Sequence, residues 1–202
     1  EKISKKPVRE IMDTWTKQPG FPLLRVDFPN NKTATIEQSA YSLKGIQSRK
    51  GAPAPLLWPI PVSYELPGKK RQSILLSDKS TTITGFAAKK FNVSETGFYR
   101  TAYDAKTLLS FGRSIQTKEL PTIDRWGLIH NAWALAEAGI LPTEVVLEFC
   151  KFYTRETDYT VLSEMFAGAV RLGSLYVSEK WYVHYKRFIR SLVSPTIKRL
   201  GF

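Results

Sequence analysis

The chain has 202 residues and a formal net charge of +12 at pH 7, with 43% hydrophobic and 24% charged residues. This composition is typical of a soluble globular protein with one large or two small domains. No apolar run is long enough to cross a membrane, and the first residues show no signal-peptide pattern. The sequence therefore predicts neither a membrane span nor a secretory leader.

The first predicted element is a helix near the start of the chain. Four apolar residues recur at helical spacing, and Pro19-Gly20 ends the pattern: Val8, Ile11, Met12 and Trp15. An amphipathic helix of this kind needs a surface to pack against, because its apolar stripe is unfavourable in water.

The pattern from residue 21 to residue 103 is that of β-structure. Pro29-Asn30-Asn31-Lys32 predicts a hairpin turn, and Pro59 and Pro61 predict an edge strand because neither can donate a ladder hydrogen bond. About seven short strands at this spacing predict an antiparallel β-sandwich. The predicted strands are Phe21–Phe28, Thr33–Tyr41, Leu56–Leu66, Ser73–Ser77, Thr81–Thr84, and a last hairpin of Phe91–Val93 with Gly97–Tyr103 across Ser94-Glu95-Thr96.

From Asp104 onward the period changes to helical. Thr122 is predicted as an N-cap, and Pro195 is predicted to end or kink the last helix. Short connections predict antiparallel helix pairs, as at the start of an α-solenoid, so the fold class is α+β and multi-domain. The predicted helices are Asp104–Phe111, Leu120–Ala138, Pro142–Tyr153, Asp158–Leu172 and Ser178–Leu200.

The sequence contains no recognisable catalytic constellation. Its two histidines, His130 and His184, are too far apart for H-E-x-x-H, which places both metal ligands on one helical face. Phosphate-binding glycine loops and a G-x-S-x-G nucleophile motif are also missing. We therefore predict no catalytic, cofactor-binding or metal-ligating residue in the chain.

Other reactive-looking residues have structural explanations. Cys150, the only cysteine, lies in an apolar helical pattern and is predicted to be a buried thiol, and it favours a reducing compartment such as the cytoplasm. Asp104, Asp124 and Asp158 lie at predicted helix starts, where a carboxylate caps backbone N–H groups. Asn92-Val93-Ser94 matches a glycosylation sequon, which we interpret as chance.

The positive charge leaves a second class open, a stand-alone basic module that binds nucleic acid or an acidic partner. Against it, the basic residues form scattered pairs beside Gly, Pro or Ser, as solvated loop charges do: Lys5-Lys6, Arg49-Lys50, Lys69-Lys70-Arg71 and Lys89-Lys90. Aromatic residues near them fit core and cross-strand packing better than a stacking platform for bases.

Four segments, in this order, resemble the zinc aminopeptidases of the aminopeptidase N family, and most of all its puromycin-sensitive and archaeal tricorn-interacting-factor branch. The segments are VREIMDTWTKQPGFPLLRV, LLWPIPVSY, KKFNVSETGFYRTAYD and DRWGLIHNAWALAEAG, and they span residues 8 to 139.

The resemblance implies a division of this chain into parts of a larger enzyme. Residues 1–18 are expected to be the last helix of a thermolysin-like catalytic domain that the chain lacks, with Val8, Ile11, Met12 and Trp15 facing that domain. Residues 19–103 correspond to a β-sandwich spacer domain, and residues 104–202 to the first helices of a C-terminal helical superhelix.

The resemblance also implies the chemistry of the parent. Zinc and a glutamate base would act on peptide N-termini, in motifs that have no matching position here, so no catalytic residue is carried over. We expect this chain alone to be inactive and to bind no zinc, with the missing catalytic domain as its partner and peptides as substrates of the parent. A membrane partner is not expected, and nucleic acid is disfavoured. Five aromatic residues are expected to anchor its elements: Trp15, Trp58, Phe91, Trp126 and Trp133.

Overall fold

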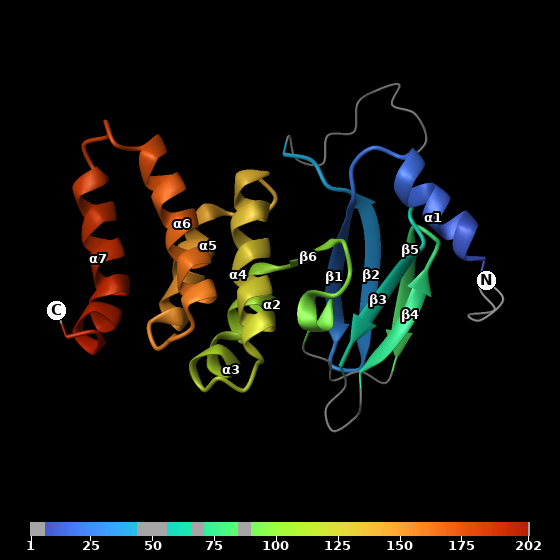
Figure 1. The fold of residues 1–202 in the computed structure, drawn as a ribbon, viewed down its shortest axis with the longest axis horizontal. Helices are drawn as coiled ribbons and strands as arrows, with labels where there is room; N and C mark the ends of the chain where they lie inside the picture. Colours follow the sequence, from blue (N-terminus) through green and yellow to red (C-terminus); the bar gives the residue numbers. More distant parts are fainter. Residues whose placement is uncertain (1–6, 44–55, 66–70, 85–89, 202) are drawn as a thin grey trace. The chain divides into compact units, whose positions relative to one another are not determined.

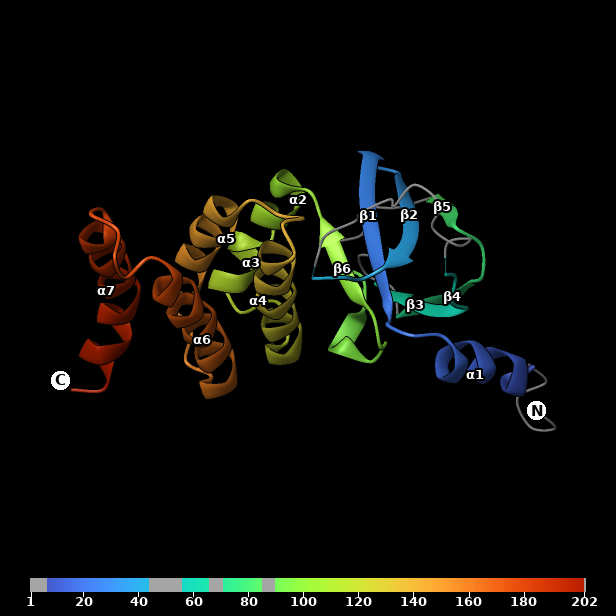
Figure 2. The ribbon, with the colours of Figure 1, turned by 90° about the horizontal axis from the view of Figure 1, so that it is seen from above.

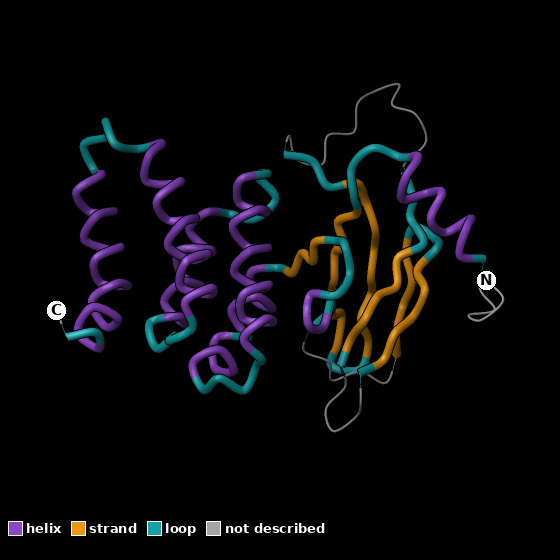
Figure 3. The backbone as a smooth tube through the Cα atoms, viewed as in Figure 1, coloured by secondary structure: helices purple, strands orange, loops and turns teal. Residues whose placement is uncertain are grey.

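The computed structural model describes residues 7–43, 56–65, 71–84 and 90–201. Contacts divide the chain into two compact units, one of Glu1–Asp104 with Ala138–Ile140 and one of Ala105–Glu137 with Leu141–Phe202. We call these the sheet unit and the helical unit. Figure 3 shows the strands in the sheet unit and most of the helices in the helical unit, which is an α+β arrangement.

The sheet unit contains a four-stranded sheet and a separate two-stranded sheet (Figure 1). In the larger sheet the strand order is β5-β2-β1-β6, and the smaller sheet pairs β3 with β4. Two of the larger sheet's neighbouring pairs are antiparallel, whereas β1 and β6 are parallel. The strands are β1 (Pro22–Asn30), β2 (Thr33–Ala40), β3 (Ile60–Tyr64), β4 (Gln72–Leu76), β5 (Ser80–Thr84) and β6 (Arg100–Tyr103).

The hairpin predicted around Asn30 is confirmed. β1 and β2 pair antiparallel up to Asn30 and Thr33, and the side-chain Oδ1 of Asn30 accepts a hydrogen bond from the N–H of Lys32 at 2.8 Å. Such an Asx contact is one reason why asparagine favours tight turns. Residues Pro59 and Pro61 belong to the predicted edge region, and β3 indeed pairs with a single full strand, β4.

The predicted hairpin across Ser94-Glu95-Thr96 is wrong. Phe91 makes only an isolated bridge to Tyr64, and Val93–Glu95 forms a 3-10 turn instead of continuing a strand. Asn92 and Ser94 have left-handed backbones with φ of 54° and 59°. Asparagine tolerates this region and can hydrogen-bond its own loop, so local turn chemistry prevailed over the alternating pattern.

Gln38 shows how a polar residue can occupy the buried face of a strand. It alternates with Ala34 and Ile36 on β2 and is only 1% exposed. Its amide nitrogen donates to the carbonyls of Trp58 at 2.9 Å and Asp78 at 2.8 Å, and its Oε1 accepts from Trp58 N–H at 2.9 Å. These bonds satisfy the amide and fix the segments that lead into β3 and β5.

Helix α1 (Val8–Lys17) packs weakly on the sheet unit and contains no buried residue. Trp15 holds it, with ring centroids 6.4 Å from Trp58 and 6.3 Å from Phe98. Thus Trp15 anchors the helix as expected, but it does so against this chain's own aromatic residues. Val8 and Met12 are 39% and 50% exposed.

The helical unit agrees with the predicted order of helices but differs at several ends. The region 104–111 forms a shorter helix that is followed by a second, unpredicted one, and Thr122 is the first helical residue rather than the cap. Pro195 lies inside the last helix and does not end it. The elements are α2 (Ala105–Ser110), α3 (Gly112–Gln116), α4 (Thr122–Glu137), α5 (Thr143–Cys150), the 3-10 turn Lys151–Tyr153, α6 (Tyr159–Leu175) and α7 (Tyr182–Arg199).

Helix α4 contacts both α5 and α6 in the helical unit. In Figures 1 and 2, α4, α6 and α7 lie side by side in that order. Trp133 is 2% exposed and lies flat on α6 at Gly168, where an added Cβ would come 2.3 Å from the indole ring. Trp133 therefore anchors α4 as predicted, while Trp126 stacks on His130 with centroids 4.6 Å apart.

Candidate functional site

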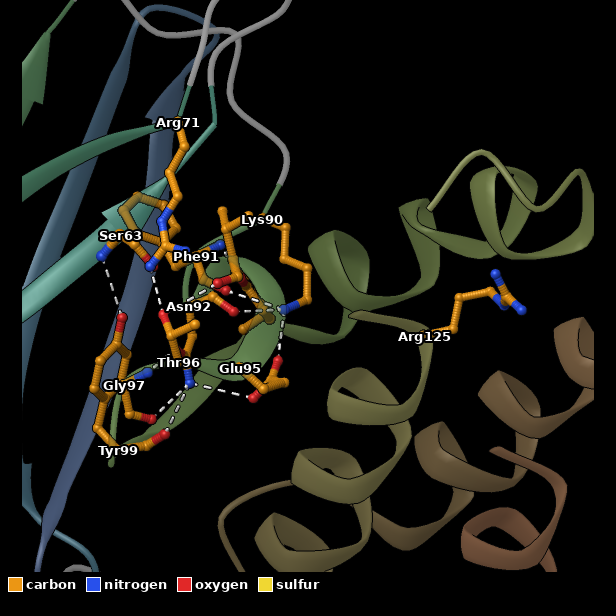
Figure 4. Close-up of polar contacts among 12 residues, drawn as sticks. Ser63, Arg71, Lys90, Phe91, Asn92, Glu95, Thr96, Gly97, Tyr99 and Arg125 are labelled. Atoms are coloured by element: carbon orange, nitrogen blue, oxygen red, sulfur yellow. Dashed lines mark hydrogen bonds and ion pairs between the residues drawn. The ribbon is translucent and has the colours of Figure 1, made fainter. Parts of the chain in front are cut away.

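A buried cluster of polar side chains lies in the loop that precedes β6 (Figure 4). Lys90 is 4% exposed, and its Nζ lies 2.6 Å from Oε1 of Glu95. The same ammonium donates to the carbonyl oxygens of Asn92 at 3.0 Å and Phe91 at 3.3 Å. The interpretation of Lys90 as a solvated loop charge is therefore wrong, because three acceptors and burial hold it in the interior. Its neighbour Lys89 lies outside the described residues.

Asn92 is the centre of this cluster. Its amide nitrogen donates to Glu95 Oε2 at 3.2 Å and to the carbonyls of Gly97 at 3.1 Å and Tyr99 at 3.3 Å. Its Oδ1 accepts from Gly97 N–H at 2.8 Å. An amide that is 1% exposed and bonded on both sides is unsuited to glycosylation in the folded chain, which fits a chance sequon.

Two tyrosines complete the cluster. The hydroxyl of Tyr103 accepts a hydrogen bond from Phe91 N–H at 2.8 Å, and that of Tyr99 accepts one from Ser63 N–H at 3.4 Å. Burial raises the pKa of Tyr99 to about 12, and it raises the pKa of Tyr103 still further. Both phenols therefore stay neutral near pH 7, and they support the loop rather than transfer protons.

A second buried ionic cluster lies in the helical unit. Arg125 donates through Nε to Glu156 Oε2 at 2.6 Å and through Nη2 to Oε1 at 3.1 Å, and its Nη1 donates to Leu120 O at 2.6 Å. The hydroxyl of Tyr153 donates to the carbonyl of Arg125 at 2.8 Å. Nη2 of Arg199 donates to the carbonyl of Glu156 at 2.8 Å, so the cluster joins α4, the segment before α6, and the end of α7.

The carboxylate of Glu156 is held in its charged form. Burial acts to raise its pKa, but hydrogen bonds from Arg125 and from the N–H groups of Asp158 and Thr157 outweigh burial and lower the pKa. A charged, fully paired carboxylate cannot serve as a general base near neutral pH without breaking the pair. Both buried clusters are therefore stabilising networks, and neither presents a free reactive group.

The predicted structural residues mostly keep the roles expected of them. Cys150 is buried, and burial raises the pKa of its thiol to about 12. Asp158 caps α6 by accepting from the N–H groups of Thr160 at 2.9 Å and Val161 at 3.2 Å. Asp124 lies in the first turn of α4, and Asp104 directly precedes α2.

The histidines do not come together. His130 lies on α4 with Nδ1 3.2 Å from Glu164 Oε1, whereas His184 is exposed on α7. Among the described residues, no group of three or more His, Cys, Asp or Glu side chains is placed to hold a metal ion. His130 and His184 therefore do not fit the ligand set of a protein zinc site, which needs at least three such ligands close together.

The sequence contained one usable signal for the buried charges. Arg125 shares a helical face with Leu128, Ile129 and Ala132, all of which are buried, so its position on the apolar face of α4 could have been read from the spacing. Lys90 and Glu95 gave no such signal, because loop geometry has no fixed period.

Within the described ranges, no helix combines the length and apolar character that a transmembrane span requires.

The described residues thus form a small sheet unit followed by a helical unit. Residues 89–202 match the family described as the ERAP1-like C-terminal domain, and the chain belongs to this family. The match includes both buried ionic clusters.

Curated relatives extend the similarity to nearly the whole chain. Aminopeptidase A of Gloydius brevicauda is 30% identical over 99% of this chain, and human glutamyl aminopeptidase is 29% identical over 100% of it. Aminopeptidase M1 of Arabidopsis thaliana is 31% identical over 85% of the chain. The chain spans only about a fifth of the length of these relatives, 22%, 22% and 21% respectively. The resemblance to aminopeptidases is thus confirmed, while the branch within the family stays a prediction.

Proposed function

We propose that this chain is the spacer and the start of the helical cap of a zinc-dependent aminopeptidase that removes N-terminal residues from peptides. The observation that carries this proposal is the similarity to aminopeptidases over 99–100% of the chain, although it covers only 22% of two of those relatives. The residues for catalysis would then lie in another part of the protein.

In this proposal the two units keep separate roles. The sheet unit acts as a β-sandwich spacer between residues 19 and 103, and α1 belongs to the catalytic domain, which it contacts through the exposed Val8 and Met12. The helical unit begins an α-solenoid that caps the catalytic cleft, and a reducing, cytoplasmic location suits the buried free thiol of Cys150. The connection after β6 acts as the hinge for opening and closing.

The catalytic part of the proposal has a direct test. The purified 202-residue chain is expected to hydrolyse no aminoacyl-anilide and to retain no stoichiometric zinc by atomic absorption after dialysis against trace zinc. The reading frame that encodes it is expected to carry H-E-x-x-H with a distal glutamate outside these residues. Zinc-dependent turnover by the chain alone, or a reading frame without that motif, would contradict the proposal.

The hinge has a separate test. Lys32→Cys and Ser178→Cys place one dye on the β1–β2 turn and one on the exposed connection between α6 and α7, and the buried Cys150 leaves only these two thiols accessible. Single-molecule energy transfer is expected to show a broad or divided distance distribution. A single narrow distribution, as narrow as that of two dyes within one unit, would argue against a hinge.

A basic binding module remains as a second candidate because of helix α7. Along Tyr182–Arg199 the helix carries no acidic side chain and five Lys or Arg: Lys186, Arg187, Arg190, Lys198 and Arg199. If this helix binds nucleic acid, the affinity for a random oligonucleotide should fall steeply with salt, since each neutralised phosphate releases counterions. Weak binding without a salt slope would remove this candidate.

A further inference from the structure

A pocket with a volume of about 350 Å³ lies between the β3–β4 hairpin and the loop that precedes β6. Its lining includes Ser63 of β3, Arg71 and Ser73 of the β4 region, and Thr96 and Gly97 of the loop. Ser63 and Ser73 are direct cross-strand partners, so their side chains share one face of the hairpin. Arg71 is two residues before Ser73 and therefore lies on the same side.

The side chains that line this pocket are rich in hydrogen-bond donors and carry positive charge. Among the described residues that line it there is a guanidinium, there are three hydroxyl groups, and there is no carboxylate. Hydroxyl and guanidinium N–H groups are hydrogen-bond donors, and a guanidinium keeps its charge at any physiological pH. A concave surface of this composition suits a ligand that carries negative charge on oxygen atoms.

Ser63 gives an independent sign of a ligand. The residue is 2% exposed, and its Oγ interacts with the Tyr99 hydroxyl but makes no well-formed hydrogen bond within the described part of the chain. A buried hydroxyl whose hydrogen-bonding capacity is incompletely satisfied is unfavourable, so a water or a ligand commonly completes it in native structures. Its backbone N–H is already bonded to the Tyr99 hydroxyl, which fixes the position of the residue.

The loop that forms the other wall is rigidly held. Arg71 donates through Nη2 to the hydroxyl of Thr96, which itself donates to the carbonyl of Val93 at 3.4 Å. Figure 4 shows this contact beside the Lys90–Glu95 pair and the Asn92 amide, which brace the left-handed turn. The bond to Thr96 uses one of the five N–H donors of Arg71, so the side chain is oriented while donors remain for a ligand.

We propose that this pocket binds a small oxyanion, a carboxylate or a phosphate group, with Arg71 supplying the charge and Ser63 and Ser73 donating hydrogen bonds. Thr96 positions Arg71 and does not contact the ligand. The proposal is independent of the aminopeptidase function, because it rests only on residues of the sheet unit.

The test is isothermal titration calorimetry of the full 202-residue chain at constant ionic strength, with sodium phosphate, sodium acetate and sodium chloride as separate titrants. Saturable one-to-one binding of phosphate or acetate is expected, and the tighter of the two identifies the group. Arg71→Gln is expected to weaken that binding at least about tenfold, the scale of a lost charge-assisted contact. Ser63→Ala is expected to weaken it several-fold with little loss of thermal stability, because the hydroxyl that is removed makes no well-formed hydrogen bond in the unliganded chain.

Arg25→Gln is the matched control. Arg25 is an exposed arginine on β1 of the same unit, outside the pocket, so its loss lowers the net charge equally and should leave the affinity unchanged. Equal weakening in Arg25→Gln and Arg71→Gln would overturn the proposal, since it would show general charge attraction. Heats that do not saturate, or chloride that binds as tightly as both oxyanions, would also overturn it. Circular dichroism checks the fold of each variant. If Arg71→Gln does not fold, the oxyanion affinity of Ser63→Ala is the test: weaker binding supports the proposal, and unchanged affinity would overturn it.

Discussion

Arg125 and Glu156 form a bidentate ion pair in the interior of the helical unit, with distances of 2.6 Å and 3.1 Å between donor and acceptor atoms. Both residues are almost fully buried, at 5% and 2% exposure. Arg125 lies in the first turn of α4, and Glu156 precedes the cap of α6, so the pair joins two helices that the chain separates by a third.

Glu156→Gln should therefore destabilise the helical unit by about 3–5 kcal/mol, because it leaves a buried guanidinium without its counter-charge. Urea unfolding at pH 7 measures the change. Glu137→Gln is the control: it breaks the exposed Arg171–Glu137 pair at 2.9 Å, which should cost less than about 1 kcal/mol. Similar losses of unfolding free energy in Glu156→Gln and Glu137→Gln would show that the buried Arg125–Glu156 pair contributes no more to stability than an exposed pair.

The same pair predicts a pH dependence. The pKa of Glu156 is lower in the folded chain than its ordinary value of 4.5, so the folded state prefers the carboxylate. Its contribution to stability is fully present above 4.5 and is lost as the pH falls through the folded pKa. Urea midpoints measured from neutral to acidic pH should fall more steeply below this value in the wild type than in Glu156→Gln. If the urea midpoints of the wild type and of Glu156→Gln fell in parallel with pH, the lowered pKa of Glu156 would be contradicted.

Glu95→Gln should destabilise the sheet unit for the same reason, because Lys90 would keep its charge at 4% exposure without a carboxylate partner. A loss of about 3–5 kcal/mol is expected on urea unfolding. The double variant Lys90→Met with Glu95→Gln should recover part of it, since the buried charge is gone. The control is Glu37→Gln. It removes the exposed ion pair in which Glu37 Oε1 lies 3.2 Å from Lys79 Nζ, and it should change the free energy of unfolding little.

Gly168→Ala should destabilise the α4–α6 contact, because the new Cβ would come 2.3 Å from the ring of Trp133. Overpacking of this kind costs about 1–3 kcal/mol even though alanine favours helix. Thermal unfolding measures it. Val170→Ala, at a position of α6 that is 70% exposed, should change stability by no more than about 0.5 kcal/mol. A stabilised Gly168→Ala variant would show that the indole can move away.

Cys150 should not react with a thiol reagent in the native chain, because it is buried and its pKa is raised to about 12. The thiolate that attacks such reagents is then scarce and inaccessible. Full reaction is expected in urea, and the exposed Ser178→Cys variant gives the fast native rate for comparison. Rapid labelling of native Cys150 would mean that helix α5 opens readily.

Helix α1 should exchange its amide hydrogens faster than any other long helix of this isolated chain. None of its residues is buried, whereas ten residues of α4 are. Hydrogen-exchange mass spectrometry should therefore show early deuteration of Val8–Lys17 and late deuteration of Thr122–Glu137. Strong protection of α1 would indicate that Trp15 and its aromatic contacts hold the helix more firmly than its burial indicates.

Local patterns predicted the elements well and their contacts poorly. The Asn30 hairpin and the four longer helices of the helical unit followed from turn residues and helical spacing, because both depend on interactions within a few residues. The parallel pairing of β6 with β1 joins Arg100 to Leu23, and no local rule relates residues so far apart. The left-handed turn at Asn92 likewise depends on the Glu95 carboxylate and the Tyr99 carbonyl, which only the folded loop brings together.

The sequence by itself determined the β1–β2 hairpin, the order of the longer helices, the family resemblance, the lack of an H-E-x-x-H motif and the burial of Cys150, because these depend on composition and short-range spacing. Only the tertiary structure decided which charges are interior. Lys90 looks like other basic residues in the sequence, and the helical spacing of Arg125 indicates its apolar face but not its partner. Both become structural because Glu95 and Glu156 meet them in a low-dielectric interior. The proposed oxyanion pocket was also not predictable from the sequence. Its lining residues Ser63, Arg71 and Thr96 come together only when the β3–β4 hairpin packs against the loop before β6.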